Sequence, residues 1–356
     1  MLNIVLLNLN GGGAEKIGLL QSQFLHNLGF KVRLVTFDYR EYYNVEEQEF
    51  DKLILNFTPK VSNVIKLMRF LIMNRQDKYI LHTSWINIYV GLGCILLGIK
   101  FLVFEHNNLE RRIAYLPTYK RLVYQRVMSF VYRRAVHVYV VSNGLKDEII
   151  SFCGKGLNPL VLYNDVSRSI SRNLNSDVVG NKILLVGRNV NQKGFDRVVK
   201  LINTIETEFL VKNKVVFTFL GLGVEELMTL VVDCKKQFVR CLSFSNDIDY
   251  HYKSSKLLLF SSRYEGFGNV LLEAISFGLP VLGSHCKHGP SEILGENYPT
   301  MSAEWDESFV LQMLKRLLLD KEFYSSVGMV SHQRALAFDK IVKAQRKDFL
   351  ENMVRL

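Results

Sequence analysis

Two carboxylate residues, Glu265 and Glu273, bracket a glycine-containing segment, GFGNVLL, in the last third of the chain. An apolar run at 256–260 comes before it and predicts a strand, and residues 269–277 predict a helix. The start of that helix, with Asn269 as its cap, would stabilise an anionic group such as a pyrophosphate through free N–H groups and the helix dipole. Both carboxylates can then accept hydrogen bonds from sugar or ribose hydroxyls.

Glu273 could instead be an ordinary solvent-facing residue of that helix. Its neighbours Leu271, Leu272, Ala274 and Ile275 make the segment largely apolar. A carboxylate in apolar surroundings needs a hydrogen-bonding partner, because its desolvation is otherwise costly. We therefore expect Glu273 to be a partnered carboxylate.

A second loop, VGRNVNQKGFD at 186–196, carries Arg188 and Lys193 between a predicted strand and a predicted helix. Arginine offers a planar fork of donors and lysine a point charge, so the two suit a diphosphate beside a helix N-terminus. The alternative is a pair of solvated surface charges.

The first strand–helix turn, NGGGAE at 10–15, holds three consecutive glycines. Glycine lets the backbone approach a ligand closely, and the helix that follows presents free N–H groups. The turn does not match the G-x-G-x-x-G dinucleotide pattern. A tight turn without any ligand explains it equally well.

These loops lie between short apolar runs and longer amphipathic stretches that alternate along the chain. Such alternation predicts parallel sheets covered on both faces. In the first half we expect strands at 3–8, 31–37, 79–82, 101–105, 137–141 and 160–163, and helices at 15–28, 62–74, 119–134 and 145–152. In the second half we expect strands at 182–186, 215–220, 256–260 and 280–283, and helices at 195–207, 224–235 and 269–277, with a mostly helical tail from 304.

The polar stretch 167–180 interrupts this alternation and predicts a linker. A chain of 356 residues is long for a single core, because such cores stop growing at about 250–300 residues. The expected fold class is therefore α/β, with two Rossmann-like domains facing across a cleft. We place the first domain at 1–168, the second at 169–340, and a C-terminal helix that can cross back to the first at 341–356.

Three motifs occur in an order that resembles the family-4 retaining glycosyltransferases, which have the GT-B fold. They are GGAE at 12–15, GR at 187–188 with QKGFD at 192–196, and E-x7-E over 265–273. Lesser matches are EHN at 105–107, VSN at 141–143 and GPSEI at 289–293, which follows the predicted last strand. The resemblance spans nearly the whole chain and is stronger in the second domain. Within the family, the chain is similar to the enzymes of bacterial surface-polysaccharide synthesis.

The resemblance implies a role for each matching residue. Arg188 and Lys193 would bind the donor diphosphate, Glu273 the ribose, and Glu265 the transferred sugar near the reacting centre. His106 matches a first-domain position that touches the sugar or the acceptor. The remaining donor-binding residues would be Gly12, Gly13, Gly266, Phe267, Gly268, Asn269, Val270 and Leu271. Proline is common in the family at the position of Gly268 and glycine at that of Ser243, and neither departure removes a chemical group.

The implied reaction is metal-independent transfer of a hexose or N-acetylhexosamine with retention of anomeric configuration, and no cofactor beyond the nucleotide-sugar. Asp247 and Asp249 have the spacing of a D-x-D metal motif, but they predict the opening of a short helix. A UDP-sugar donor is favoured by the GPSE run at 289–292. The implied acceptor is a lipid-linked glycan of a bacterial surface polysaccharide, such as lipopolysaccharide or capsule.

Charge and composition indicate the kind of partner and the cellular compartment. A net charge of +11 favours a polyanionic partner, and five cysteines without C-x-x-C spacing fit a reducing cytosol better than a disulfide framework or a zinc site. The first residues, MLNIVLL, predict a buried strand and lack the features of a signal peptide. The apolar stretch 85–104 is interrupted by polar residues and predicts a buried helix and strand.

Residues 111–146 carry eight cations and no acidic residue, interleaved with aromatic side chains. This pattern is typical of a membrane-surface helix, and the alternative is a packed helix with a solvated basic face. Nucleic acid is disfavoured because no binding module is present. We expect a protein of the cytoplasm, peripheral on the inner face of the plasma membrane, that contacts anionic lipid through Arg111, Arg112, Lys120, Arg121, Arg126, Arg133 and Arg134.

Three other functions compete with this interpretation. A dehydrogenase with two Rossmann domains is disfavoured, because G-x-G-x-x-G with a later acidic residue is missing. A GT-B sugar-nucleotide epimerase or hydrolase would share the same loops. A catalytically inactive, basic membrane-surface binding protein of the same fold is the alternative outside enzymes.

Overall fold

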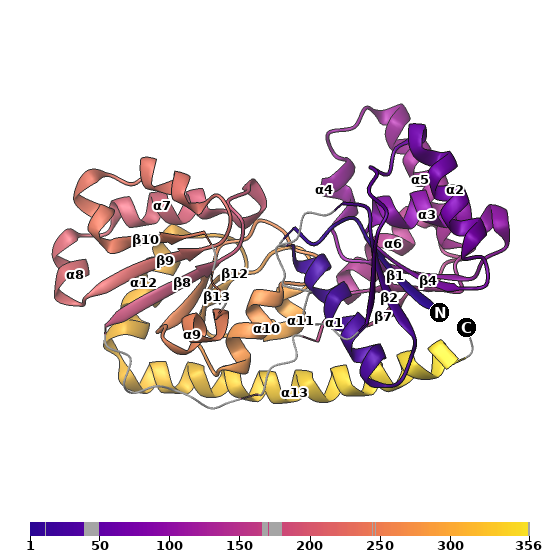
Figure 1. Cartoon of the computed structure of the whole chain (residues 1–356). Coiled ribbons are helices and arrows are strands. Elements are labelled where there is room, and N and C mark those ends of the chain that lie inside the picture. The colour runs from indigo at the N-terminus through magenta and orange to yellow at the C-terminus, as the bar shows by residue number, and fades with distance from the viewer. Residues whose placement is uncertain are drawn as a thin grey trace. The chain divides into compact units, whose positions relative to one another are not determined.

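The computed structural model describes residues 1–10, 12–38, 50–165, 170, 180–243, 245 and 247–354 (Figure 1). The chain divides into two compact units, which are described separately. The first comprises Met1–Ser167 with Val342–Leu356, and the second comprises Arg168–Ile341. Most of the predicted linker 167–180 lies outside the described residues.

The first unit is built on a parallel sheet with the strand order β3-β2-β1-β4-β5-β6-β7. Its strands are β1 (Leu2–Leu6), β2 (Val32–Thr36), β3 (Asp51–Ile54), β4 (Lys78–His82), β5 (Phe101–Glu105), β6 (His137–Val140) and β7 (Leu160–Val161). Its helices are α1 (Gly13–Asn27), α2 (Val64–Met73), preceded by the 3₁₀ turn η1 (Val61–Asn63), α3 (Ser84–Leu97), α4 (Leu109–Ile113), α5 (Thr118–Tyr132) and α6 (Asn143–Cys153).

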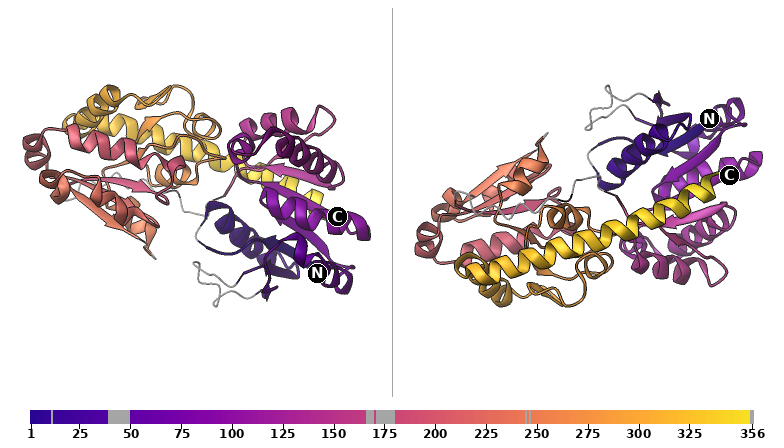
Figure 2. Two further views of the ribbon diagram at one scale, coloured as in Figure 1. Left: turned by 90° about the horizontal axis from the view of Figure 1, so that it is seen from above. Right: turned by 90° about the horizontal axis from the view of Figure 1, so that it is seen from below.

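Helices cover both faces of this sheet. Successive strand residues point to opposite faces, and Tyr79 contacts Phe70 of α2, while Ile80 belongs to a core cluster that includes Leu25 of α1 and Phe349. Helices α2, α3 and α5 therefore pack side by side on one face, and α1 covers the other (Figure 2). This arrangement explains why the strands are apolar on both faces.

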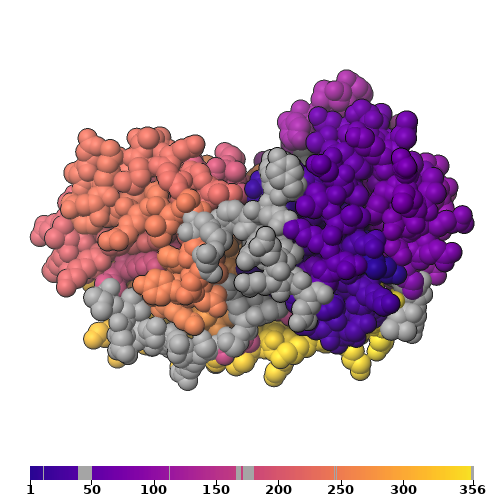
Figure 3. Space-filling view, viewed as in Figure 1, coloured from indigo at the N-terminus to yellow at the C-terminus, as the bar shows by residue number. Residues whose placement is uncertain are grey.

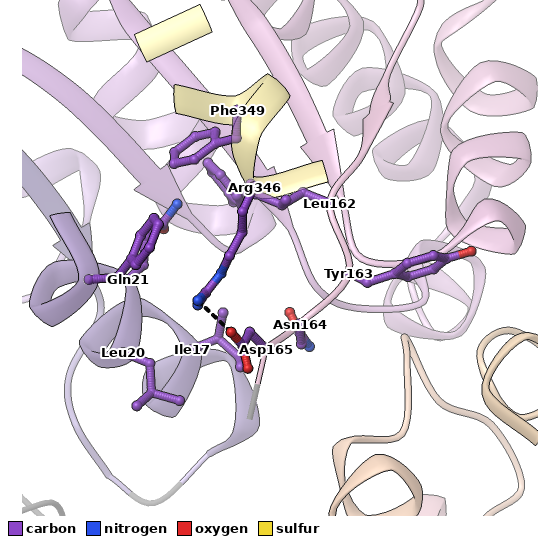
Figure 4. A pocket seen from close by; sticks show the side chains of 11 residues that line it. Ile17, Leu20, Gln21, Leu162, Tyr163, Asn164, Asp165, Arg346 and Phe349 are labelled. Atoms are coloured by element: carbon purple, nitrogen blue, oxygen red, sulfur yellow. Dashed lines mark ion pairs between the residues drawn. The ribbon is translucent and has the colours of Figure 1, made fainter. Parts of the chain in front are cut away.

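The end of the chain belongs to the first unit. Helix α13 (Lys321–Val354) places Phe349 against Phe104 and Tyr139, with ring centroids 5.8 and 5.2 Å away. Arg346 forms an ion pair with Asp165, and its guanidinium lies 4.2 Å from the centroid of Phe24. Phe349, Arg346 and Asp165 line a small cavity of about 40 Å³ together with Phe24 and Phe104 (Figure 4). The last turns of α13 thus complete the core of the first unit.

The second unit has a parallel sheet with the strand order β10-β9-β8-β11-β12-β13. Its strands are β8 (Asn181–Val186), β9 (Val215–Leu220), β10 (Val239–Leu242), β11 (Leu257–Phe260), β12 (Val281–Ser284) and β13 (Met301–Ser302). Its helices are α7 (Phe195–Thr204), α8 (Thr207–Lys212), α9 (Ile248–Lys253), α10 (Asn269–Ser276), α11 (Pro290–Leu294), α12 (Glu307–Leu319) and the first part of α13. The 3₁₀ segments are η2 (Asn191–Lys193), η3 (Val224–Thr229) and η4 (Asp233–Phe238).

The predicted helix at 224–235 is wrong, since two 3₁₀ segments occupy this region. Thr229, Val231 and Val232 are β-branched, which lowers helix propensity at the point of interruption. Strands β3, β10 and β13 were not predicted, and because β13 comes later, the GPSEI motif does not follow the last strand. The interpretation of 85–104 is confirmed, and among the described residues no helix combines the length and apolar character needed to cross a bilayer.

Candidate active site

In the second unit, the loop between β8 and α7 is tied to the loop between β11 and α10. The backbone N–H of Arg263 donates to the carbonyl of Gln192 at 2.7 Å, and the Ser261 hydroxyl donates to the carbonyl of Lys193 at 2.7 Å. The guanidinium of Arg263 also binds both carboxylate oxygens of Asp196, at 2.7 and 2.6 Å. This two-pronged contact holds the pKa of the Asp196 carboxyl below its usual range. The two loops therefore form one rigid assembly at the carboxyl end of the sheet.

Gly194 allows this close approach between the two loops. Its φ of +64° is left-handed, and a Cβ added there would lie 2.1 Å from the carbonyl oxygen of Ser261. Any other residue would both strain the backbone and collide with the facing chain. The glycine of the predicted QKGFD motif is thus explained by loop-to-loop contact.

Lys193 and Glu265 form an ion pair within this assembly. The Lys193 ammonium donates to Oε1 of Glu265 at 2.7 Å, and the Ser262 hydroxyl donates to the same oxygen at 2.7 Å. The side-chain amide of Gln192 donates to Oε2 at 3.2 Å. An ionised carboxylate offers about four acceptor positions, so these three donors leave one for a further hydroxyl. The structure thus brings together Lys193, which is predicted to bind the diphosphate, and Glu265, which is predicted to bind the sugar.

Arg188 differs from Lys193 in having no partner among the described residues. Its side chain is exposed, and within the described ranges no residue accepts a hydrogen bond from its guanidinium or forms an ion pair with it. It lies two residues after the end of β8, on the same loop as Lys193. A cation that the protein leaves uncompensated at this edge of the sheet is available to an anionic ligand.

Helix α10 (Asn269–Ser276) begins at the predicted residue, but its N-cap is a different one. The N-cap is Gly268, with a φ of +98°, and Asn269 is the first helical residue, so the prediction that Asn269 caps the helix is wrong. A left-handed N-cap favours glycine, and no side chain caps this end. Phe267 is buried and packs on Phe338, and Leu271 is buried as well, while Val270 is half-buried. The backbone N–H of Leu271 donates to the carbonyl of Gly268 at 2.9 Å, and the donor-binding role of these residues stays a prediction.

The buried carboxylate of Glu273 has a phenol as its partner. Oε2 accepts a hydrogen bond of 2.7 Å from the hydroxyl of Tyr252, which lies on α9 and is itself buried. The expectation of a partnered carboxylate is confirmed. Asp247 is the N-cap of α9, accepting from the N–H of Tyr250, so the DID segment opens a short helix as predicted.

In the first unit, a side chain of helix α1 lies over the glycine residues that begin this helix. Gly12 is the N-cap of α1 and Gly13 its first residue, and a Cβ at position 12 would lie 1.9 Å from Oε2 of Glu15. The Glu15 carboxylate therefore lies over the start of α1, where it interacts favourably with the helix dipole. The absence of a side chain at Gly12 makes room for this carboxylate, and the donor-binding role of both glycines stays a prediction.

His106, which follows β5, is hydrogen-bonded to a second histidine. Nδ1 of His82, the last residue of β4, lies 2.8 Å from Nε2 of His106. Both side chains are buried, and burial lowers the pKa of His106 to about 4. Burial, with the neighbouring His106, also holds the pKa of His82 well below its usual range. The two rings are therefore neutral at neutral pH.

The seven cations predicted to contact lipid lie on α4, α5 and the turns around them, and Figure 3 shows violet residues of this region on the surface of the first unit. Arg111, Lys120, Arg121, Arg126, Arg133 and Arg134 are exposed, while the side chain of Arg112 is outside the described part. Some of these cations have internal partners, since Arg121 donates to the carbonyl of Ala114 and Arg133 to that of Cys153. Large apolar side chains are exposed among them, including Tyr115, Tyr119, Leu122, Val123 and Phe130.

Two family models together cover most of the chain. Residues 11–164 match the model of Glycosyltransferase Family 4, and residues 166–326 match the model of glycosyl transferases group 1. The chain is a family-4 glycosyltransferase of the GT-B fold. The predicted family and fold class are thereby confirmed.

Several proteins resemble this glycosyltransferase over nearly its full length. The N-acetylgalactosamine-N,N'-diacetylbacillosaminyl-diphospho-undecaprenol 4-alpha-N-acetylgalactosaminyltransferase of Campylobacter jejuni is 24% identical over 96% of both chains. The amylovoran biosynthesis glycosyltransferase AmsD of Erwinia amylovora is 24% identical over 92% of both. Among solved structures, Anabaena Alr3699/HepE in complex with UDP-glucose has a TM-score of 0.81 at 15% identity, covering 100% of this chain and 99% of that one.

The structure adds residues to the site that the motifs did not include. Tyr252 holds Glu273, Arg263 ties the loops through Asp196, and His82 pairs with His106. His82 ends a predicted strand and Arg263 follows one, so their positions at the carboxyl ends of strands could have drawn attention to them. Tyr252 lies within a short helix, and nothing in its sequence context pointed to Glu273.

Proposed function

We propose that this glycosyltransferase moves a hexose or N-acetylhexosamine from a UDP-sugar to a lipid-linked glycan in bacterial surface-polysaccharide synthesis, with retention of anomeric configuration. The observation that carries the proposal is the charged loop assembly of the second unit. There Arg188, which has no partner in the described part of the chain, and the Lys193–Glu265 pair lie on loops that Arg263 and Asp196 hold together.

The chemistry follows from these charges. As the bond between the sugar and the diphosphate breaks, negative charge grows on the leaving phosphate, and preorganised cations stabilise it. Arg188 and Lys193 supply that charge, assisted by the start of α10, which no side chain caps. Glu265, hydrogen-bonded on both oxygens, orients Lys193 and accepts a hydroxyl of the sugar. The departing phosphate itself can take the proton of the acceptor, so no enzymic nucleophile is needed.

The proposed reaction needs no metal ion. In the part of the chain that the structure describes, no group of three or more His, Cys, Asp and Glu side chains is placed to hold one. The stereochemistry is tested by the anomeric configuration of the product, measured by NMR. Inversion would contradict the proposed mechanism, and loss of turnover in EDTA that Mg²⁺ restores would contradict metal independence.

Named relatives support the choice of substrates. The C. jejuni relative is named for transfer to a diphospho-undecaprenol acceptor, and the Erwinia relative for amylovoran biosynthesis. The Anabaena structure contains UDP-glucose. A thermal-shift screen across UDP-, GDP- and ADP-sugars tests the donor, since a ligand at 100 times its Kd stabilises by about 2.7 kcal/mol. We expect UDP-sugars alone to raise the Tm, and turnover of the donor without acceptor would instead favour an epimerase or hydrolase.

The basic face of α5 suits an anionic membrane surface on the cytoplasmic side. Exposed Tyr119 and Phe130 lie on the same helix as exposed Lys120 and Arg126, and together they can combine apolar insertion with attraction to lipid phosphates. Sedimentation with anionic and neutral liposomes tests it, and we expect binding to anionic vesicles only. The Lys120→Glu/Arg126→Glu double variant should lose this binding, whereas the control Lys212→Glu in the second unit should keep it. Equally weak binding of the unaltered protein to both vesicle types would rule out a membrane role.

A further inference from the structure

His82 and His106 form a pair whose outer nitrogens have no hydrogen-bond partner in the described part of the chain. Their rings are nearly parallel, with centroids 5.1 Å apart and planes 17° apart. His82 is fully buried, yet its Nε2 accepts or donates no hydrogen bond within the described residues, and the same holds for Nδ1 of His106. Two buried, unsatisfied nitrogens are costly, so they indicate that another polar group binds here.

A neutral imidazole has one N–H and one lone pair. The hydrogen bond between the rings uses one of each, whichever ring donates. If His82 donates, Nδ1 of His106 carries a proton and Nε2 of His82 a lone pair, and if His106 donates, these states are exchanged. The pair can therefore present either a donor or an acceptor at Nδ1 of His106 without any change in net charge.

Both rings are held firmly by their surroundings. His82 stacks on Phe104 with centroids 4.9 Å apart, and it precedes Thr83, whose φ of +74° is strained for a β-branched residue. On the other side, the carboxylate of Glu105 accepts from the backbone N–H of His106 at 3.1 Å and from the hydroxyl of Tyr132 at 2.7 Å. Strained backbone that persists in a well-packed region is often part of a functional site.

The geometry points to His82 as a positioning residue for His106, setting its ring orientation and its tautomer through the shared hydrogen bond. The partner suited to the outer nitrogens is a hydroxyl group, which both donates and accepts, as the hydroxyls of a sugar do. This inference rests on the proposed function for its catalytic consequence, but the hydrogen bond itself can be tested without any substrate.

The first test is NMR of the full chain labelled with ¹⁵N-histidine, assigned with a His106→Gln variant. His82→Phe keeps the aromatic packing on Phe104 and removes the nitrogens, while His82→Asn keeps a polar atom near Nδ1. The control His137→Phe replaces a histidine that contacts Tyr139 elsewhere in the same unit. We expect the Nε2 resonance of His106 to shift in His82→Phe but not in the control. An unchanged resonance in His82→Phe, or the resonance of an unbonded imidazole in the unaltered protein, would overturn the inference.

The second test is the effect of the same variants on sugar transfer. His82→Phe should lower kcat on the order of ten- to hundredfold, the effect of misplacing a group at the reacting centre, with an unchanged KM for the nucleotide-sugar. His82→Asn should recover part of the loss. A full kcat in His82→Phe would overturn the positioning role. A wild-type protein that transfers no sugar would contradict the proposed function, while the NMR result would still decide whether His82 orients His106.

Discussion

The second unit organises its candidate site with charges, and the first unit organises its own with neutral hydrogen bonds. In the second, Lys193 binds Glu265, Arg263 binds Asp196, and Arg188 pairs with no other described residue. In the first, two neutral histidines share one hydrogen bond, and Glu105 is satisfied by a phenol and backbone N–H groups. The difference fits the groups that each would meet, because a diphosphate needs cations and a sugar hydroxyl needs groups that both donate and accept.

The largest expected effect is that of removing the charges. Arg188→Ala should lower the rate of transfer on the order of 10²-fold or more, because a cation that stabilises the leaving group is lost. The measurement is kcat/KM with the donor found in the thermal-shift screen. Lys200→Ala is the control, since Lys200 is an exposed cation of α7 that pairs with Glu307 at the surface. Equal rates in Arg188→Ala and the control would show that Arg188 does not stabilise the leaving group.

Lys193→Ala should affect both rate and stability. We expect a similar loss of rate, and a lower free energy of unfolding by about 3 kcal/mol, because the buried Glu265 carboxylate would lose its counter-charge. Urea unfolding measures this loss, and Glu265→Gln added to Lys193→Ala should restore part of it. No recovery in the double variant would mean that the ion pair does not account for the loss.

The buried histidine pair of the first unit predicts that the free energy of unfolding depends on pH. The pKa of His106 is about 4 in the folded protein because of burial, against about 6.5 when unfolded. Its contribution to stability is therefore complete above pH 6.5 and is lost as the pH falls towards 4, by at most about 3 kcal/mol. Urea unfolding at several pH values should show a shallower decline in His106→Phe than in the unaltered protein. Identical declines would show that His106 is not held neutral.

The smallest expected effect is on stability, and it compares a glycine that is needed for its backbone conformation alone with one that also makes a close contact. Gly194 and Gly29 both have positive φ, but a Cβ at Gly29 meets nothing within 4 Å, whereas one at Gly194 meets the Ser261 carbonyl. We expect Gly29→Ala to cost about 1 kcal/mol from strain alone, and Gly194→Ala to cost more. Thermal unfolding measures both. Equal losses of stability in the two variants would mean that the contact between Gly194 and Ser261 adds nothing to the cost of backbone strain.

Much of the fold follows from the residues alone. The runs 101–105 and 215–220 match the observed strands without adjustment, because apolar stretches buried on both faces admit little else. Strand β3 was missed because its sequence, DKLI, is half charged, and the strand lies at the exposed edge of the sheet. Edge strands carry a weaker apolar pattern since one side of the sheet stays open to solvent.

The charged residues of the candidate site could be recognised from the sequence alone. Arg188, Lys193 and Glu265 lie in short motifs after strands and Glu273 in the helix that follows, where chemistry and spacing can be recognised locally. Only the tertiary structure decided how they are partnered, and that His82 meets His106 and Tyr252 meets Glu273. These partners are 24 and 21 residues apart along the chain and lie on different elements. Such contacts depend on the order of strands in the sheet and on how helices pack, which no local pattern of residues specifies.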